Sequence, residues 1–228
     1  MRKGSTDKNV KSKSIGRKIF TVTVTITIIS MIILLSINTL MFKNILDSIE
    51  KDILVRGKNV RGSISSADIE EVLKNKITGS YDYKKLKNDL INGKNNENIN
   101  YASILTKTTE GEVEILVDTE SNLLSFGEKI IVTNEINKAF SDEVVSNEES
   151  ENKKNSINAY YPIKSSNGEV SAVLEIKSDV TNIINIKSKI LLQLGILALF
   201  LTFIYSIMSL LISKSINKNV KDVISGLV

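Results

Sequence analysis

The sequence predicts an α+β domain carried between two transmembrane helices. Two stretches of 24 residues, 19–42 and 190–213, contain no Asp, Glu, Lys or Arg. A helix of that length spans about 36 Å, enough to cross a hydrocarbon core of about 30 Å. Between these stretches, residues 43–189 change from helical to strand-like spacing of their apolar residues near Asn100, which predicts helices followed by an antiparallel sheet.

The charges beside the apolar stretches predict the orientation of the chain in a cell membrane. Residues 1–18 contain seven Lys or Arg and one acid, and residues 214–228 contain three Lys and one acid. Short basic flanks stay in the cytoplasm, so we expect both termini inside and residues 43–189 outside. The middle segment then holds 20 cations and 24 acids. The basic ends therefore predict contact with anionic membrane lipid, and no nucleic acid is expected as a partner.

After the first apolar stretch, apolar residues recur every three or four positions and predict that the same helix continues outward. These residues are Ile45, Leu46, Ile49, Ile53, Leu54, Val60 and Ile64. The part of this stripe on Ile45, Ile49 and Ile53 predicts either a homodimer through the helix or a helix that covers the sheet. Two shorter helices follow, Ala67–Ile77 with a cap at Ser65, and a third from Tyr83 that ends at the polar run 92–98.

The second half of the middle segment predicts four strands and two tight turns. The strands are Tyr101–Lys107, Val113–Asp118, Ile157–Lys164 and Val170–Lys177. Glycines in the turns 109–111 and 165–168 supply the positive φ that such turns need. Both faces of the first two strands are apolar, so both need a cover, the long helix on one side and loops or a loop-lined pocket on the other. Residues 135–140 predict an amphipathic stretch, and 141–156 an exposed loop.

The residue types that are missing exclude several classes of site. The chain has no Cys and no His, which excludes disulfides, thiolate or His-ligated metal sites and His-dependent catalysis. The acidic run 148–151 lacks the alternating oxygens and tight glycine turn of a calcium loop. No glycine-rich phosphate loop is present. We therefore expect no metal, no cofactor and no enzymatic activity, although an Asp/Glu pair assembled in three dimensions leaves an ectoenzyme open.

The order of these segments resembles the single Cache domain of bacterial transmembrane receptors. The resemblance covers roughly residues 43–188. It rests on YKKLKNDL (83–90), YASILTKTTEGEVEILVD (101–118), Gly127 and AYYPIKSSNGEVSAVLEIKSDVTNI (159–183). It implies a PAS-like antiparallel sheet behind a long N-terminal helix, with a small-molecule pocket. Residues 216–220 (INKNV) are similar to the start of a HAMP linker helix, and an amphipathic stripe at Ile216, Val220, Val223 and Leu227 accompanies them.

Three departures from the family patterns bear on the ligand. Asn219 stands where HAMP helices usually have Pro. Lys177 stands where many Cache domains have the first Asp of a D-x-D pair, while Asp179 keeps the second. The Arg and Trp motif of amino-acid-binding double Cache domains is absent, so the resemblance predicts no amino-acid ligand.

Six residues are candidates for ligand binding, and each also has a structural alternative. They are Tyr101, Asp118, Tyr160, Tyr161, Glu175 and Lys177. Tyrosine supplies an apolar ring and a hydroxyl that orients a ligand, but it also packs well in strands. Neighbours on a strand point to opposite faces, so Tyr160 and Tyr161 cannot line one pocket without a bulge. Glu175 and Lys177 share a face and would suit a polar or zwitterionic ligand, unless they form a solvated pair. Asp118 would bind an amine or cap a turn.

Together these features predict a transmembrane sensor that binds a small molecule outside the cell and relays a conformational change inward. The resemblance favours the front part of a chemotaxis receptor, truncated at the start of HAMP, or a chain that passes its signal to a cytoplasmic partner. The sensory half of a histidine kinase or diguanylate cyclase is the close alternative. A second alternative is a non-sensory, membrane-anchored interaction protein. This alternative predicts a large exposed apolar patch instead of a pocket.

Overall fold

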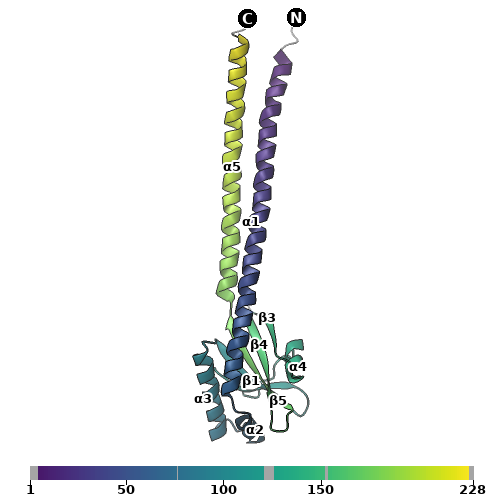
Figure 1. Cartoon of the computed structure of the whole chain (residues 1–228), viewed down its shortest axis with the longest axis vertical. Helices are drawn as coiled ribbons and strands as arrows, with labels where there is room; N and C mark the ends of the chain where they lie inside the picture. Colours follow the sequence, from purple (N-terminus) through teal and green to yellow (C-terminus); the bar gives the residue numbers. More distant parts are fainter. Residues whose placement is uncertain (1–4, 76, 121–125, 152–153, 226–228) are drawn as a thin grey trace. The chain divides into compact units, whose positions relative to one another are not determined.

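The computed structural model describes residues 5–75, 77–120, 126–151 and 154–225 of the 228-residue chain (Figure 1). Contacts divide the chain into two compact units. One unit is Asn44–Ile184, called the middle domain below, and the other combines residues up to Lys43 with those from Asn185. The end residues 1–4 and 226–228, which belong to the predicted basic tail and HAMP-like segment, lie outside the described residues.

Two long helices contain the apolar stretches, α1 (Ser5–Ser63) and α5 (Thr181–Ser225). Their segments Phe20–Ser63 and Thr181–Ile212 are long and apolar enough to cross a membrane. Many of their apolar side chains are exposed, including Ile26 at 59% and Leu199 at 74%. A continuous apolar surface of this kind is what a lipid-facing helix needs. The helix α1 also continues into the middle domain, as its apolar stripe predicts.

The middle domain is built on a five-stranded sheet with the order β2-β1-β5-β4-β3. All neighbouring strands are antiparallel. The strands are β1 (Tyr101–Lys107), β2 (Val113–Asp118), β3 (Val145–Glu151), β4 (Lys154–Lys164) and β5 (Val170–Asp179). The bounds of β1 and β2 agree with the sequence prediction, and Gly111 and Gly168 in the two turns have φ of +85° and +87°.

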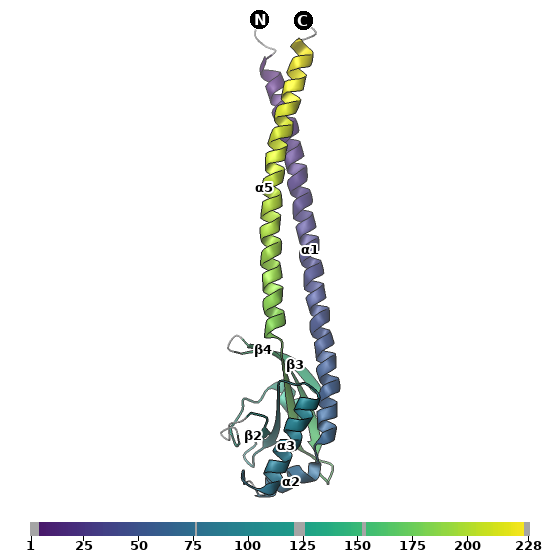
Figure 2. The same cartoon turned by 90° about the vertical axis from the view of Figure 1, so that its left-hand side faces the viewer.

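One face of the sheet, called the helix face below, packs against α1, α2 (Ser66–Asn75) and α3 (Tyr81–Asn96). Ile53 and Val60 of α1, with Leu86 of α3, join Leu174 and Ile176 of β5 in the larger apolar core. Figure 2 shows α3 in front of the strands in this domain. Burial of these side chains, at about 1.5–3 kcal/mol each, is the main stabilisation of this arrangement.

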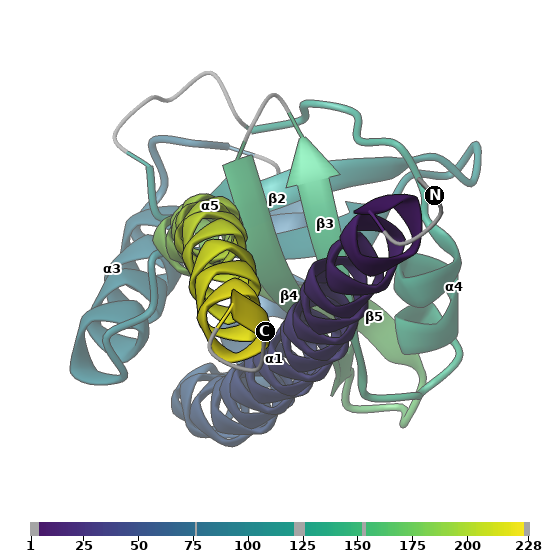
Figure 3. The same cartoon turned by 90° about the horizontal axis from the view of Figure 1, so that it is seen from above.

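The opposite face, called the α4 face below, has a smaller core. Ile136 and Ala139 of α4 (Asn134–Phe140) pack with Leu105, Tyr160 and Val173 of the sheet. In Figures 1 and 3, α3 and α4 lie on different sides of the strands. Both faces of the sheet are therefore covered, as the apolar residues on both faces of β1 and β2 predict, but the cover of this second face includes the helix α4 where the sequence predicts loops or a loop-lined pocket.

The apolar stripe of α1 covers the sheet. Ile53 is buried in the larger core, and Leu46 and Ile49 pack against it. Ile45 remains 40% exposed. Ile49 and Ile53, two of the three residues on which the homodimer prediction is based, thus pack inside the chain. Little apolar surface of this stripe is left for contact with a second copy.

Three predicted elements are corrected by the structure. The second helix ends at Asn75 rather than Ile77. The third helix runs through the polar run to Asn96, because Gly93 faces α1 while Asn92, Asn95 and Asn96 face solvent. The loop predicted at 141–156 is wrong, since β3 and the start of β4 occupy most of it. An edge strand pairs on one side only, so its composition stays polar and resembles a loop.

Gly57 marks a very close approach between α1 and the sheet. A Cβ atom at this position would lie 2.4 Å from Ile176 Cδ1 and 2.4 Å from Tyr161 Cε2. The Tyr161 hydroxyl also donates a hydrogen bond of 2.5 Å to the carbonyl oxygen of Leu54. Only glycine at residue 57 lets the helix backbone lie against these two side chains.

We expect Gly57→Ala to lower the free energy of unfolding by about 1–3 kcal/mol, because the added methyl group overpacks this contact. Urea unfolding of the chain in detergent, followed by circular dichroism, measures the change. Gly62→Ala on the same helix is the matched control, since a Cβ there meets nothing within 4 Å. The control should gain about 0.4–1 kcal/mol. Equal effects of the two variants would show that α1 does not pack on the sheet at Gly57.

Candidate functional site

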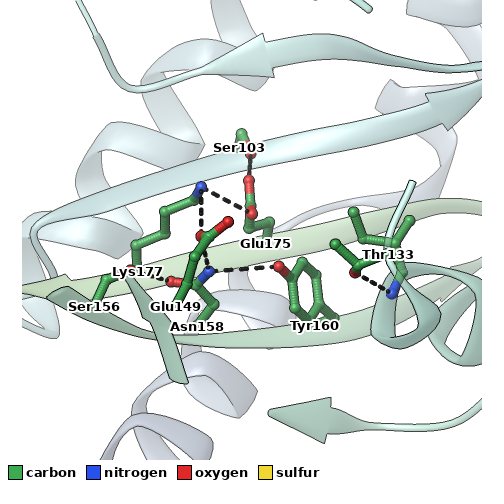
Figure 4. A network of polar contacts seen from close by, with 9 residues as sticks. Ser103, Thr133, Glu149, Ser156, Asn158, Tyr160, Glu175 and Lys177 are labelled. Carbon is green, nitrogen blue, oxygen red and sulfur yellow. Dashed lines mark hydrogen bonds and ion pairs between the residues drawn. The ribbon is translucent and has the colours of Figure 1, made fainter. Parts of the chain in front are cut away.

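Polar side chains gather on the α4 face where three strands run side by side. Cross-strand partners place their side chains on the same face. One row across β1, β5 and β4 is Tyr101, Lys177 and Asn158, and the next row is Ser103, Glu175 and Tyr160. Figure 4 shows five of these side chains, those of Ser103, Asn158, Tyr160, Glu175 and Lys177, converging above the central strands. We call these six residues, with Glu149 and Asn147 of β3, the polar cluster.

Glu175 is the buried anion at the centre of the polar cluster. Its side chain is 7% exposed, and its Oε2 accepts a hydrogen bond of 2.8 Å from the Ser103 hydroxyl. Lys177 Nζ lies 3.2 Å from its other oxygen, Oε1. A buried carboxylate is costly unless it has such partners. The register that sets Ser103 of β1 beside Glu175 is therefore a condition for folding with this glutamate inside, while Lys177 follows two residues along the same strand.

Lys177 lies between two carboxylates and an aromatic ring. Its Nζ is 3.7 Å from Glu149 Oε2 and 5.8 Å from the centre of the Tyr101 ring. Burial lowers the pKa of Lys177, but the negative charges of Glu175 and Glu149 outweigh this effect and raise the pKa above its ordinary value. The side chains of Lys177 and Glu149 are 34% and 36% exposed, so this end of the polar cluster faces solvent.

The second arm of the polar cluster runs through Asn158. Its Nδ2 donates to Glu149 Oε2 at 2.6 Å and lies 3.5 Å from the Tyr160 hydroxyl, while its Oδ1 accepts from Ser156. Burial, reinforced by the charge of Glu175, raises the pKa of Tyr160. Burial also raises the pKa of Tyr101. A hydrogen bond with Ser103 opposes this rise, and the charge of Glu175 adds to it.

Asn147 is paired in register with Asn158, so its side chain is on the α4 face. Its oxygen Oδ1 is buried and accepts no hydrogen bond from any residue in the described part of the chain. Buried acceptors in folded proteins almost always have a donor. This oxygen is therefore able to accept a hydrogen bond from a water or a ligand.

Four of the six residues singled out from the sequence come together: Tyr101, Tyr160, Glu175 and Lys177. Tyr161 does not join them. It lies in the larger core on the helix face, beside Gly57, and burial raises the pKa of its hydroxyl. The prediction that Tyr160 and Tyr161 point to opposite faces is thus confirmed.

Asp118 lies at the margin of the polar cluster. It pairs in register with Ser103 and is almost fully buried. Its carboxylate is 3.6 Å from Nζ of Lys87, which comes from α3. Asp118 therefore forms an ion pair between β2 and α3. This role is different from the turn cap that the sequence analysis gives as the structural alternative.

Sequence reasoning missed Ser103, Asn147, Glu149 and Asn158. Asn147 and Glu149 belong to the segment predicted as a loop, so no strand face was assigned to them. In the sequence, Ser103 interrupts the apolar run of β1, and Asn158 is a polar residue near the start of the apolar run of β4. These two interruptions are the signal that could have indicated a polar site. Their meeting depends on pairing between distant strands, which local spacing does not reveal.

A separate cavity of about 320 Å³ lies elsewhere in the middle domain. It is bounded by α1, by the turn before β1 and by the junction of β5 with α5. Its lining is Ile49, Asp52, Ile53, Arg56, Asn98, Asn100, Ser178, Asp179, Val180 and Ile183. Arg56 is held there by Asp52 at 2.7 Å and by the carbonyl oxygen of Glu97 at 2.8 Å. In the part of the chain that the structure describes, no three His, Cys, Asp or Glu residues gather as metal ligands.

Several solved bacterial sensor domains are similar to this chain. The sensor domain of E. coli DcuS has a TM-score of 0.46 at 13% identity, covering 61% of this chain and 94% of its own. The sensor domain of the V. cholerae histidine kinase DctB scores 0.43 at 9% identity and covers 61% and 58%. The ligand-binding domain of the Campylobacter jejuni chemoreceptor Tlp3, in complex with L-valine, scores 0.40 at 11% identity and covers 76% and 66%.

This chain thus spans less than two thirds of the DctB and Tlp3 structures. Scores below 0.5 are too low to establish a common fold or function. No protein-family model and no curated protein matches the sequence.

We expect Ser103→Ala to lower the free energy of unfolding by about 1.5–3 kcal/mol, because the buried Glu175 carboxylate loses a donor. Urea unfolding of the chain in detergent measures the loss. Ser166→Ala is the matched control, since its hydroxyl donates at 3.1 Å to Glu70 at an exposed position. That control should change stability by no more than about 0.5 kcal/mol. A loss of that small size in Ser103→Ala would mean that Glu175 is solvated rather than buried.

We expect the free energy of unfolding to fall above about pH 10. Tyr101 and Tyr160 ionise in the unfolded chain near pH 10 but stay protonated when folded, since their folded pKa is raised. The unfolded state then binds fewer protons, so each tyrosine contributes a loss of about 1.4 kcal/mol per pH unit. The raised pKa of Lys177 acts in the same direction, because its stabilisation is complete below pH 10.5 and is lost as the pH rises through the folded value.

Tyr160→Phe should make this alkaline slope shallower by about 1.4 kcal/mol per pH unit, and urea titrations between pH 9 and 11.5 measure it. Tyr81→Phe removes a hydroxyl from a side chain that is 79% exposed and serves as the control. A slope unchanged by Tyr160→Phe would show that the Tyr160 hydroxyl reaches water in the folded chain.

Proposed function

We propose that this chain is a transmembrane sensory receptor whose middle domain binds a small molecule outside the cell at the polar cluster. The observation that carries the proposal is the buried Glu175 carboxylate, held among polar side chains on one sheet face of a small domain. Such groups add little stability compared with apolar packing. Polar side chains that converge inside an otherwise apolar core are typical of ligand sites.

Strand β5 supplies a physical path from the polar cluster to both apolar helices. Glu175 and Lys177 face the polar cluster, and Ile176 between them lies against α1 at Gly57. Asp179 ends the strand, and its Oδ1 accepts a 2.8 Å hydrogen bond from the backbone N–H of Thr181, the first residue of α5. A ligand that moves β5 therefore acts on α1 and α5 at once, provided that it binds the two arrangements with different affinity.

The finer proposal is a chemotaxis-type receptor that passes its signal to a cytoplasmic partner. Its apolar helices would span the cell membrane, with both termini in the cytoplasm and the basic ends against anionic lipid. A sensor kinase or diguanylate cyclase is the alternative for the receptor class, and a homodimer remains part of the proposal. We do not propose an enzymatic activity, because the chain has no His or Cys. The single Cache resemblance supports the sensory role through the segments 101–118 and 159–183.

A ligand screen tests the sensory role. The full chain in detergent micelles is heated with small carboxylates, amines, purines or sugars, and the midpoint of unfolding is followed by calorimetry. We expect one chemical class to raise the midpoint, since a ligand at 100 times its Kd stabilises by about 2.7 kcal/mol. Cooperative unfolding with no shift from any class would favour the membrane-anchored interaction protein instead.

Membrane orientation is testable because the natural chain has no cysteine. Single cysteines replace Ser150, an exposed residue of β3, or Ser14 in the basic N-terminal segment. On intact cells, an impermeant maleimide should label Ser150→Cys, whereas Ser14→Cys should react only after lysis. The reverse pattern would place the middle domain in the cytoplasm and end the proposal of an external sensor.

A further inference from the structure

The environment of the Lys177 ammonium group is that of a bound cation. Four acceptors of positive charge or of N–H groups lie on this part of the α4 face. They are the carboxylates of Glu175 and Glu149 at 3.2 Å and 3.7 Å, the Tyr101 ring at 5.8 Å, and the unpartnered Oδ1 of Asn147, which is in the same row as Lys177 but two strands away. Carboxylates combined with an aromatic face are the groups by which proteins bind alkylammonium ions.

The charges of this site also favour a cation. Glu149, Glu175 and Lys177 together have a net charge of −1, and the site without the Lys177 side chain would have −2. Nearby carboxylates raise the pKa of Lys177 although burial opposes this, so the site stabilises an ammonium ion better than water does. Asn147 Oδ1 still lacks a donor with Lys177 in place, so a ligand with more than one N–H group would satisfy an oxygen that Lys177 leaves unpaired.

Lys177 is also able to leave this position. Its side chain is 34% exposed, whereas Glu175 beneath it is 7% exposed. A lysine stem is flexible, and its ammonium group regains full hydration when it turns outward. Displacement therefore exposes the two carboxylates to solvent from the side that Lys177 now covers.

We propose that Tyr101, Asn147, Glu149 and Glu175 form a binding site for the ammonium group of a small-molecule amine, and that Lys177 occupies this site until the ligand displaces it. This inference rests on the proposed sensory function and names the chemical class of its ligand. Because Glu175 and Lys177 lie on β5, the exchange of one ammonium group for another changes the contacts of the strand that leads to α5.

Chemical rescue tests this proposal. Lys177→Ala removes three methylene groups and the ammonium group of the side chain, and n-butylammonium chloride, one carbon longer than the removed part, supplies an alkylammonium ion from solution. The full chain in detergent micelles is measured by calorimetry at constant ionic strength, with sodium chloride, n-butanol and sodium butyrate as the comparison solutes. We expect n-butylammonium alone to raise the unfolding midpoint of Lys177→Ala, with a Kd at least tenfold lower than for the natural chain, in which Lys177 competes.

Three further variants make the result specific. Lys177→Thr suits strand geometry and carries the same expectation if Lys177→Ala does not fold. Lys177→Met keeps the stem without the charge, fills the space, and should not bind the probe. Lys164→Ala removes the cation of an exposed ion pair with Asp142 and should respond as the natural chain does.

Two outcomes would overturn the proposal. One is an equal response of Lys177→Ala to n-butylammonium and sodium chloride. The other is that the natural chain binds butyrate and Lys177→Ala does not. That result would mean that Lys177 binds an anionic ligand through its own positive charge. Both readouts are independent of membrane orientation and signalling. A rescued site in a chain oriented the wrong way would refute the sensory function and leave the ammonium site standing.

Discussion

The middle domain depends on the neutralisation of one buried charge, the carboxylate of Glu175. A carboxylate in this position is tolerated only with donors on both oxygens, and these come from Ser103 on β1 and Lys177 on β5 itself. The donor from β1 requires the register of the central strands, whereas Lys177 lies beside Glu175 because alternate residues of one strand share a face. A slip by one residue would turn Glu175 toward the apolar helix face and Ile176 toward the polar cluster. The charge thus costs stability but specifies one arrangement of the sheet.

Alternation along β5 gives this strand two different functions. Its residues on one face form the apolar contact with α1, and its residues on the other face form the polar cluster. The end of the strand connects to α5 within two residues. In the proposed receptor, a ligand at the polar cluster would act on β5 directly, and β5 would pass the displacement to both long helices without an intermediate loop.

The sequence predicted the elements whose pattern is local and missed those that depend on distant pairing. Strands β1 and β2 each have a strong apolar run. Asn100 precedes the first run and Gly111 lies in the turn between the two, and the predicted bounds of both strands agree with the structure. The polar pattern of β3 predicts a loop, because only pairing with β4 makes a strand of this segment. Of the candidate residues, Tyr101, Tyr160, Glu175 and Lys177 lie on one face of the sheet, as alternation along their strands indicates, and Tyr161 lies on the other. The places of Glu149 and Asn158 beside them depend on which strands are neighbours.

Strand β3 is also an open edge of the sheet. Unpaired backbone groups at such an edge would recruit a strand from another molecule and begin aggregation. Here the edge has two adjacent acids, Glu148 and Glu149, with Glu148 exposed to solvent. A second copy of the strand would bring like charges together, so self-pairing is disfavoured. Glu149, which helps to hold Lys177, therefore also contributes to keeping the domain soluble.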